Sequence, residues 1–298
     1  MTAGAAPAAI AAVGARIAAL PPLRDVIAAA GLRADKALGQ NFLLDLQLLD
    51  RLAGLVPLAP GETVFEVGPG PGGLTRALLK AGARVVAVER DRRAVAALAS
   101  LAAAADGRLE LVEADARAVD GRALAGDGAH IAANLPYNIA TPLLLGWLTA
   151  EPWPPWWRSA TLMFQREVAE RIVAAPGTPA YGRLSVLAAF RTRARIRMRL
   201  PPRAFTPAPS VESAVVQLVP APPLLNVPLA RLEAVTTRAF GQRRKMLRQA
   251  LKPILDAVER AGVDPTCRAE TLPPLAFARI AAHADPARLG LPTPTGGC

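Results

Sequence analysis

The sequence is poor in the residues that build metal centres and disulfide frameworks. Its 298 residues include two cysteines, Cys267 and Cys298, and two histidines, His130 and His283. Two cysteines so late in the chain supply neither a disulfide framework nor a zinc-binding spacing, and this usage fits a reducing compartment. So few histidines also argue against a histidine-based catalytic triad. We therefore expect a protein without a metal site.

Long apolar runs are missing as well. No strongly apolar run reaches the roughly 18 residues that a membrane span needs, so we predict no membrane-spanning helix. The alanine-rich first residues lack the basic stretch that opens a secretory signal. Arg16, Arg24 and Arg33 resemble the arginines of a mitochondrial presequence, but Asp25 and Asp35 do not fit one. We expect a cytoplasmic protein.

Acidic side chains are outnumbered. The chain has 35 basic and 24 acidic residues, a net charge of +11 and a pI near 11.0. This excess favours a polyanionic partner, and nucleic acid is the first hypothesis; the alternative is a charge that serves only solubility. The 52% hydrophobic fraction is sufficient for a large core and excludes disorder of the whole chain.

Apolar runs alternate with helical periodicity, which indicates an α/β fold of the doubly wound, Rossmann-like kind with a parallel sheet. We expect an N-terminal arm or marginal helix at 1–22, a doubly wound domain at 23–220 and a small all-helical domain at 221–298. The expected strands are 63–67, 84–88, 109–112, 130–133, 161–164, 191–200 and 211–219, and the expected C-terminal helices are 229–240, 244–260 and 273–284.

A glycine-rich turn, Glu66–Thr75 (EVGPGPGGLT), follows the first strand and opens a helix. Glycines such as Gly68 and Gly70 let a backbone approach a nucleotide-like cofactor closely; a tight turn without a ligand is the alternative. Glu89 and Asp115 end the next two strands, at the edge where open α/β sheets bind ligands. Glu89 can accept both hydroxyls of a ribose, and Asp115 can accept from an adenine amino group. The alternative for Glu89 is a helix cap or a solvated carboxylate.

The carboxyl group of Glu66 lies at the buried end of a strand, so it needs partners. On the same edge, the fourth strand ends in Asn134, Leu135, Pro136 and Tyr137. The Asn134 side-chain oxygen and the carbonyls around Pro136 can accept the N–H groups of a flat amine, and Tyr137 offers a face for stacking. Acceptors that hold these N–H groups favour a more pyramidal and reactive nitrogen. The alternative is a plain strand-to-turn sequence.

Four stretches in this order resemble the ribosomal RNA adenine N6,N6-dimethyltransferase family: Lys36–Leu43 (KALGQNFL), Glu66–Thr75, Asn134–Tyr137 (NLPY) and Phe205–Ser213 (FTPAPSVES). The resemblance runs from about Leu23 to the last helices. It implies a class I methyltransferase domain that uses S-adenosyl-L-methionine. It also implies that two adjacent adenosines of small-subunit (16S) rRNA each receive two methyl groups, in small-subunit biogenesis.

The resemblance also implies a role for each motif residue. Asn41 and Leu43 close over the methionine end of the cofactor, and Glu66, Gly68 and Gly70 surround it. Glu89 holds its ribose, Asp115 its adenine, and Asn134 contacts both the cofactor and the target amine. Asn134, Leu135, Pro136 and Tyr137 form the catalytic tetrapeptide. Phe205 stacks on the target adenine from the face opposite Tyr137; the alternative is a turn whose phenylalanine is simply buried.

Three alternatives to the dimethylation of small-subunit rRNA differ from it in the substrate or in the class of function. The first is a large-subunit rRNA methylase of the macrolide-resistance type, and Leu135 with the long helical tail favours the small-subunit enzymes instead. The second is a non-catalytic nucleic-acid-binding relative, against which the intact Asn134 and Tyr137 argue. The third, protein-glutamine methylation, favours proline where this chain has Leu135. We expect a monomer whose partner is small-subunit rRNA or the pre-30S particle.

Two basic stretches are candidates for phosphate contacts. Residues 191–200 read as a strand with Arg191, Arg193, Arg195, Arg197 and Arg199 on one face. The tail adds Arg243, Arg244, Lys245 and Arg248. Contacts of this kind position RNA without reading its sequence, and a solvated charged face is the alternative in both places.

Overall fold

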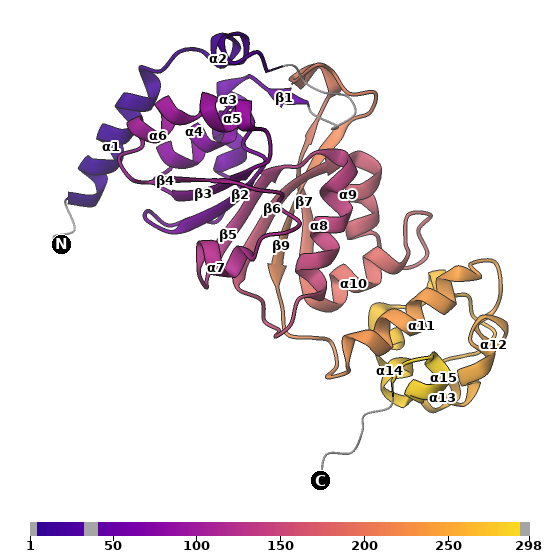
Figure 1. Cartoon of the computed structure of the whole chain (residues 1–298). Helices are drawn as coiled ribbons and strands as arrows, with labels where there is room; N and C mark the ends of the chain where they lie inside the picture. Colours follow the sequence, from indigo (N-terminus) through magenta and orange to yellow (C-terminus); the bar gives the residue numbers. More distant parts are fainter. Residues whose placement is uncertain (1–4, 33–40, 293–298) are drawn as a thin grey trace. The chain divides into compact units, whose positions relative to one another are not determined.

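A seven-stranded sheet in the order β4-β3-β2-β5-β6-β9-β7 organises the fold (Figure 1). The structure is a computed structural model that describes residues 5–32 and 41–292. The strands from β4 to β6 run parallel, and β9 is antiparallel to β6. The sheet strands are β2 (Thr63–Val67), β3 (Arg84–Glu89), β4 (Leu109–Glu113), β5 (Ala129–Asn134), β6 (Trp157–Gln165), β7 (Thr192–Leu200) and β9 (Ser213–Pro220).

Helices alternate with the strands, and the predicted α/β doubly wound fold is confirmed. A two-stranded pair of β1 (Phe42–Leu43) and β8 (Phe205–Thr206) stands apart from the sheet. The α-helices are α1 (Ala5–Ala18), α2 (Leu23–Ala29), α3 (Leu46–Ala53), α4 (Gly73–Lys80), α5 (Arg92–Ala97), α6 (Ala99–Ala104), α7 (Gly121–Ala125), α8 (Tyr137–Thr149), α9 (Arg166–Val173), α10 (Arg183–Arg191), α11 (Leu229–Gly241), α12 (Leu247–Ala250), α13 (Leu255–Arg260), α14 (Pro274–His283) and α15 (Pro286–Leu289).

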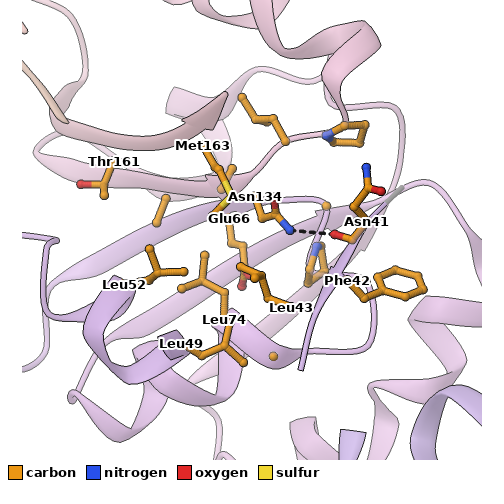
Figure 2. A pocket seen from close by; sticks show the side chains of 18 of the residues that line it. Asn41, Phe42, Leu43, Leu49, Leu52, Glu66, Leu74, Asn134, Thr161 and Met163 are labelled. Atoms are coloured by element: carbon orange, nitrogen blue, oxygen red, sulfur yellow. Dashed lines mark hydrogen bonds between the residues drawn. The ribbon is translucent and has the colours of Figure 1, made fainter. Parts of the chain in front are cut away.

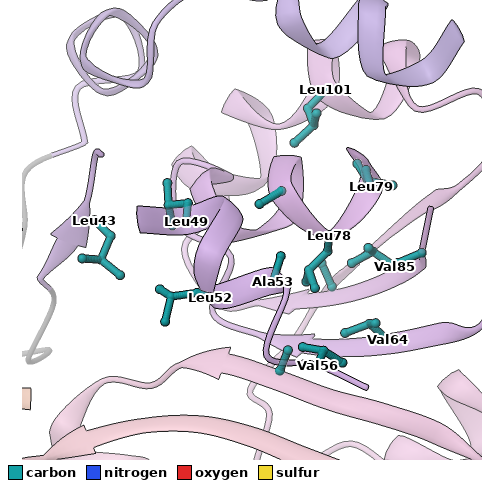
Figure 3. Close-up of a cluster of buried hydrophobic side chains, with 14 of the residues drawn as sticks. Leu43, Leu49, Leu52, Ala53, Val56, Val64, Leu78, Leu79, Val85 and Leu101 are labelled. Carbon is teal, nitrogen blue, oxygen red and sulfur yellow. The ribbon is translucent and has the colours of Figure 1, made fainter. Parts of the chain in front are cut away.

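The core beneath one face of the sheet joins α1, α3 and α4 to β2 and β3 (Figure 3). Helix α3 is amphipathic: Leu49 and Leu52 are buried, and Asp45 caps its start by accepting from the Gln47 and Leu48 amides at 2.9 and 3.1 Å. Strands β2 and β3 are buried on both faces after their first residue, as a sheet covered on both sides requires.

The N-terminal segment is a helix, the second of the two forms expected for it. In α1, Val13 and Ile17 are buried in the same core. Arg16 fixes the helix through an ion pair with Asp106 and a hydrogen bond to the Ala104 carbonyl oxygen, both at 3.0 Å. Helix α1 therefore contributes to the fold of the sheet domain. Within the described ranges, no helix combines the length and apolar character that a bilayer crossing demands.

The chain divides into two compact units: residues 1–169 with 195–220, and residues 170–194 with 221–298. The domain bounds expected from the sequence stay a prediction. In this division residues 170–194 group with the C-terminal helices. The cause is an aromatic core: the Tyr181 hydroxyl donates to Leu272 O at 2.8 Å, and its ring meets Phe240, which contacts Phe277.

The prediction of one helix over residues 244–260 is wrong. The segment consists of α12, a 3-10 turn at Lys252–Ile254 and α13. Pro253 lies in that turn, where it removes a backbone donor and disfavours helical geometry in the residue before it. Two further 3-10 turns in the described part of the chain, Pro202–Ala204 and Ala269–Thr271, also lie between regular elements.

Replacing Gly72 with alanine should destabilise the protein by about 1–3 kcal/mol. Gly72 precedes α4 with φ of +85°, and a Cβ there would lie 2.6 Å from Leu98 Cδ2. Gly146→Ala is the matched control, because no atom lies within 4 Å of its added Cβ and it sits inside α8. Urea unfolding should show a lower midpoint for the Gly72 variant only; equal midpoints would contradict the proposed strain.

Candidate active site

The glycine-rich turn joins β2 to α4 at the carboxyl end of the sheet. The Gly68 amide donates to Val88 O at 2.9 Å, which ties the turn to the neighbouring strand. Gly70 has φ of +53°, and its amide donates to Glu89 Oε2 at 3.1 Å. A Cβ on Gly70 would lie 3.3 Å from the Phe42 ring, so glycine keeps this aromatic side chain close to the turn.

Glu66 is a buried carboxyl group on the floor of the site. It is 1% exposed, and its Oε2 has no hydrogen-bond partner among the described residues. Burial raises the pKa of Glu66 to about 8; the Thr75 hydroxyl opposes this shift and the Glu89 carboxylate adds to it. The group is therefore largely neutral near pH 7, and a cation bound beside it would favour its ionised form.

Glu89 is held rigidly at the end of β3. Its Oε1 accepts from the Arg90 and Asp91 amides at 2.7 and 2.9 Å, in addition to the Gly70 amide on Oε2. A carboxylate has about four acceptor positions, so capacity remains for a ligand hydroxyl. Glu89 faces two adjoining pockets, which also share Gly68 and Pro136.

Asp115 lies in the second of these pockets, after β4. Its carboxylate accepts from the Arg117 amide at 2.9 Å and from Arg117 Nε and Nη2 at 3.1 and 2.7 Å. These bonds, with the charge of Arg90, lower the pKa of Asp115 to about 2. The group is thus an acceptor only, which suits an amino group and disfavours a carbonyl oxygen.

The tetrapeptide Asn134–Tyr137 lines the same pocket as the glycine turn, and Figure 2 shows Asn134 beside Asn41. Asn134 Nδ2 donates to Asn41 O at 3.1 Å, which turns its Oδ1 toward other partners. The Tyr137 hydroxyl lies 2.6 Å from Ser213 Oγ, so the ring is held at its far end. Burial raises the pKa of Tyr137, and the hydroxyl therefore stays protonated.

The first pocket brings together most of the predicted site. Asn41, Leu43, Glu66, Gly68, Gly70, Glu89 and all four residues of the tetrapeptide line it. Sequence reasoning missed the apolar residues among them, since each has the pattern of an ordinary core position. They include Phe42, Leu49, Leu52, Leu74, Met163 and Val215, together with the polar Thr161, and of these only Phe42 had a signal, its place between Asn41 and Leu43.

Part of the predicted site stays a prediction, and Phe205 lies elsewhere than expected. Residues 36–40 of the first motif lie outside the described residues. Phe205 lines neither pocket: it is 4% exposed, pairs with Leu43 between β8 and β1, and belongs to the buried core. This burial favours the alternative of a structural phenylalanine over a ring that stacks on a base.

The predicted phosphate-binding residues differ in how accessible they are to RNA. Arg191 is not in the strand, because α10 continues through it, and it is 3% exposed, which leaves no surface for RNA. Arg243 pairs with Glu270 at 2.9 Å and donates to Pro179 O at 2.8 Å, so it supports the C-terminal unit. The remaining predicted residues are exposed: Arg193, Arg195, Arg197, Arg244, Lys245 and Arg248.

A family model and the sequences of known proteins point to the same family. The model of a family described as ribosomal RNA adenine dimethylase matches residues 31–285. A protein of Xanthobacter autotrophicus named ribosomal RNA small subunit methyltransferase A is 58% identical over 268 residues, which cover 88% of this chain and 93% of the relative.

Solved structures share the fold. A dimethyladenosine transferase from Plasmodium falciparum has a TM-score of 0.70 at 23% identity, over 83% of this chain and 98% of that one. The 23S rRNA methyltransferase ErmE has a TM-score of 0.63 at 27% identity, over 82% of this chain and 99% of that one. The Rossmann-like methyltransferase architecture predicted from the sequence is thereby confirmed.

Proposed function

Because the chain belongs to the ribosomal RNA adenine dimethylase family, we propose that it dimethylates the N6 amino groups of two adjacent adenosines in small-subunit rRNA. The observation that carries this proposal is the pocket in which Asn134 and Tyr137 face the glycine turn and Glu66. Such an enzyme acts in the cytoplasm on rRNA or on the immature small subunit.

The two adjoining pockets fit S-adenosyl-L-methionine. Asp115 in one pocket suits an adenine amino group, and Glu89, which both pockets share, suits the ribose between the two halves of the molecule. The unpartnered Oε2 of Glu66 lies in the other pocket, where the cationic methionine portion would supply its missing partner. When bound, this cofactor supplies a methyl group activated by its sulfonium charge.

The chain's own residues orient the acceptor. Asn134 Oδ1 accepts no hydrogen bond in the described part of the chain, so it can accept one amine N–H. Pro136 O is already used by the Ile139 and Ala140 amides at 3.1 Å, which leaves the Leu135 carbonyl as the backbone acceptor for a second N–H. Tyr137 supplies a face for the adenine ring, and positioning provides most of the rate.

The small-subunit substrate is favoured over the large-subunit alternative by degree of similarity. The relative named for the small subunit is 58% identical, whereas ErmE, named for 23S rRNA, is 27% identical. The non-catalytic alternative is disfavoured by the pocket itself, since its acceptor groups remain open. The exposed Arg244, Lys245 and Arg248 support a role of the C-terminal helices in binding RNA.

Incubation with unmethylated small ribosomal subunits and radiolabelled methyl donor should yield N6,N6-dimethyladenosine after digestion of the rRNA. Mapping should place the label at two adjacent nucleotides, and large subunits in the same assay should remain unlabelled. Label in the large subunit alone would support the resistance-type methylase, and absence of label from both would support a non-catalytic relative.

A further inference from the structure

Strand β7 carries a row of arginines along an edge of the sheet, beyond β9. Within the sheet-containing unit, Arg195, Arg197 and Arg199 are exposed, while Ile196 and Met198 between them are partly buried. Side chains two apart on a strand point to the same side, at steps of about 6.6 Å. The three guanidinium groups therefore form one line on the surface.

Arg195 and Arg197 of this row keep their positive charge. Neither β7 nor β9 contains an acidic residue. Arg197 Nη1 donates to the neutral Gln217 Oε1 at 3.1 Å, and Gln217 Nε2 is anchored on Leu55 O at 2.6 Å. Among the described residues, no acidic side chain pairs with Arg195 or Arg197. Other arginines of this unit are neutralised: Arg84, Arg92, Arg122 and Arg158 each form an ion pair.

The row leads toward the first pocket. Leu200, the last residue of β7, is buried in the cluster that contains Leu43 and Met163, which line that pocket. The chain continues through the turn Pro202–Ala204, where Arg203 is exposed, into β8 beside β1 (Figure 1). A strand of nucleic acid lying along β7 would therefore arrive at β1, whose Phe42 and Leu43 line that pocket.

We propose that Arg195, Arg197, Arg199 and Arg203 form a track that binds the phosphate backbone of the substrate RNA beside the nucleotide held in the pocket. The inference rests on the proposed function, because it takes RNA as the substrate. A guanidinium group can donate two parallel hydrogen bonds to the oxygens of one phosphate. A regularly spaced line of such groups matches the regularly repeated charge of an RNA backbone. Such contacts position the strand and leave the choice of base to the pocket.

Arginines on an edge strand have one further use, which is to prevent edge-to-edge pairing with another chain. The two roles predict different behaviour. A phosphate track is sensitive to salt and tolerates lysine, since lysine also binds phosphate. Edge protection affects association between copies of the protein and leaves RNA affinity unchanged.

Three variants separate these roles: R195Q/R197Q/R199Q, the charge-conserving R195K/R197K/R199K, and the control R84Q/R108Q/R122Q. The control removes the same charge at the amino ends of β3 and β4 and in α7. Binding to purified small-subunit rRNA is measured over a series of salt concentrations, so the result does not depend on methyl transfer. Binding of S-adenosylhomocysteine and the sedimentation of each variant are measured in parallel.

For the glutamine variant of the track, the slope of log K against log salt should decrease by about 2, from three contacts at roughly 0.7 each. Its affinity for rRNA should fall about tenfold or more, while the lysine variant and the control retain most of the slope. S-adenosylhomocysteine binding should change less than twofold in all three. An unchanged slope, a slope reduced equally in the control, or self-association as the only effect would overturn the track. Failure of the parent protein to methylate small subunits would count against the proposed function alone.

Discussion

Replacing Asn134 with alanine is expected to lower the rate of methyl transfer by about 100- to 1,000-fold, the usual effect of losing one preorganised polar group at a reacting centre. The side chain is fixed by its hydrogen bond to Asn41 O, so its Oδ1 is directed before the target binds. Alanine leaves the amine with one acceptor fewer, and no neighbouring side chain replaces it.

The measurement is single-turnover methylation of small subunits at saturating enzyme, which reports the chemical step. S-adenosylhomocysteine binding by the variant should fall less than tenfold, because Glu89 and the glycine turn remain. Asn226→Ala, at an exposed position in the C-terminal unit, is the control and should retain the parental rate. A rate within threefold of the parent for the Asn134 variant would contradict the proposed chemistry.

The site could be predicted because of one property of parallel sheets. Glu66, Glu89 and Asn134 are far apart in sequence, yet each lies at or next to the end of a parallel strand, so the fold itself brings them to one edge. The prediction needed only that the strands run parallel, and not their order in the sheet. The same reasoning put Asp115 at this edge, and the structure has it in the adjoining pocket.

The missed features depend on contacts that local patterns do not encode. Phe205 is buried because β8 pairs with β1, about 160 residues earlier in the chain. Tyr181 joins the C-terminal unit through Leu272 and Phe240, a choice made by packing and not by periodicity. Arg191 continued a period of two by sequence, but it closes a helix in the structure. Leu49 and Met163 had the pattern of core residues, and their second role as pocket walls follows only from the fold.

The Glu66→Gln variant should be more stable than the parent in the absence of cofactor, and the difference should grow with pH. The pKa of Glu66 in the folded protein is about 8, above its ordinary value of 4.5. A carboxyl group whose pKa is raised by folding contributes most below about pH 4.5, and this contribution is lost as the pH rises toward 8. Near pH 7 the loss is on the order of 3 kcal/mol, which glutamine avoids because it carries no ionisable proton.

The Glu66→Gln substitution should also change how cofactor binding is coupled to proton release. A cationic ligand beside Glu66 favours the carboxylate, so the parent should release close to one proton on binding S-adenosylmethionine at pH 7, and glutamine should release none from this position. Urea unfolding from pH 5 to 8 measures the first effect, and calorimetry in two buffers of different ionisation enthalpy measures the second. Asp45, an exposed helix cap, gives the control Asp45→Asn, which retains Glu66 and should therefore show the pH dependence and the proton release of the parent. A parent whose stability does not fall relative to the Glu66 variant between pH 5 and 8 would show that the buried carboxyl is ionised throughout, and the stabilisation expected from glutamine would then be absent.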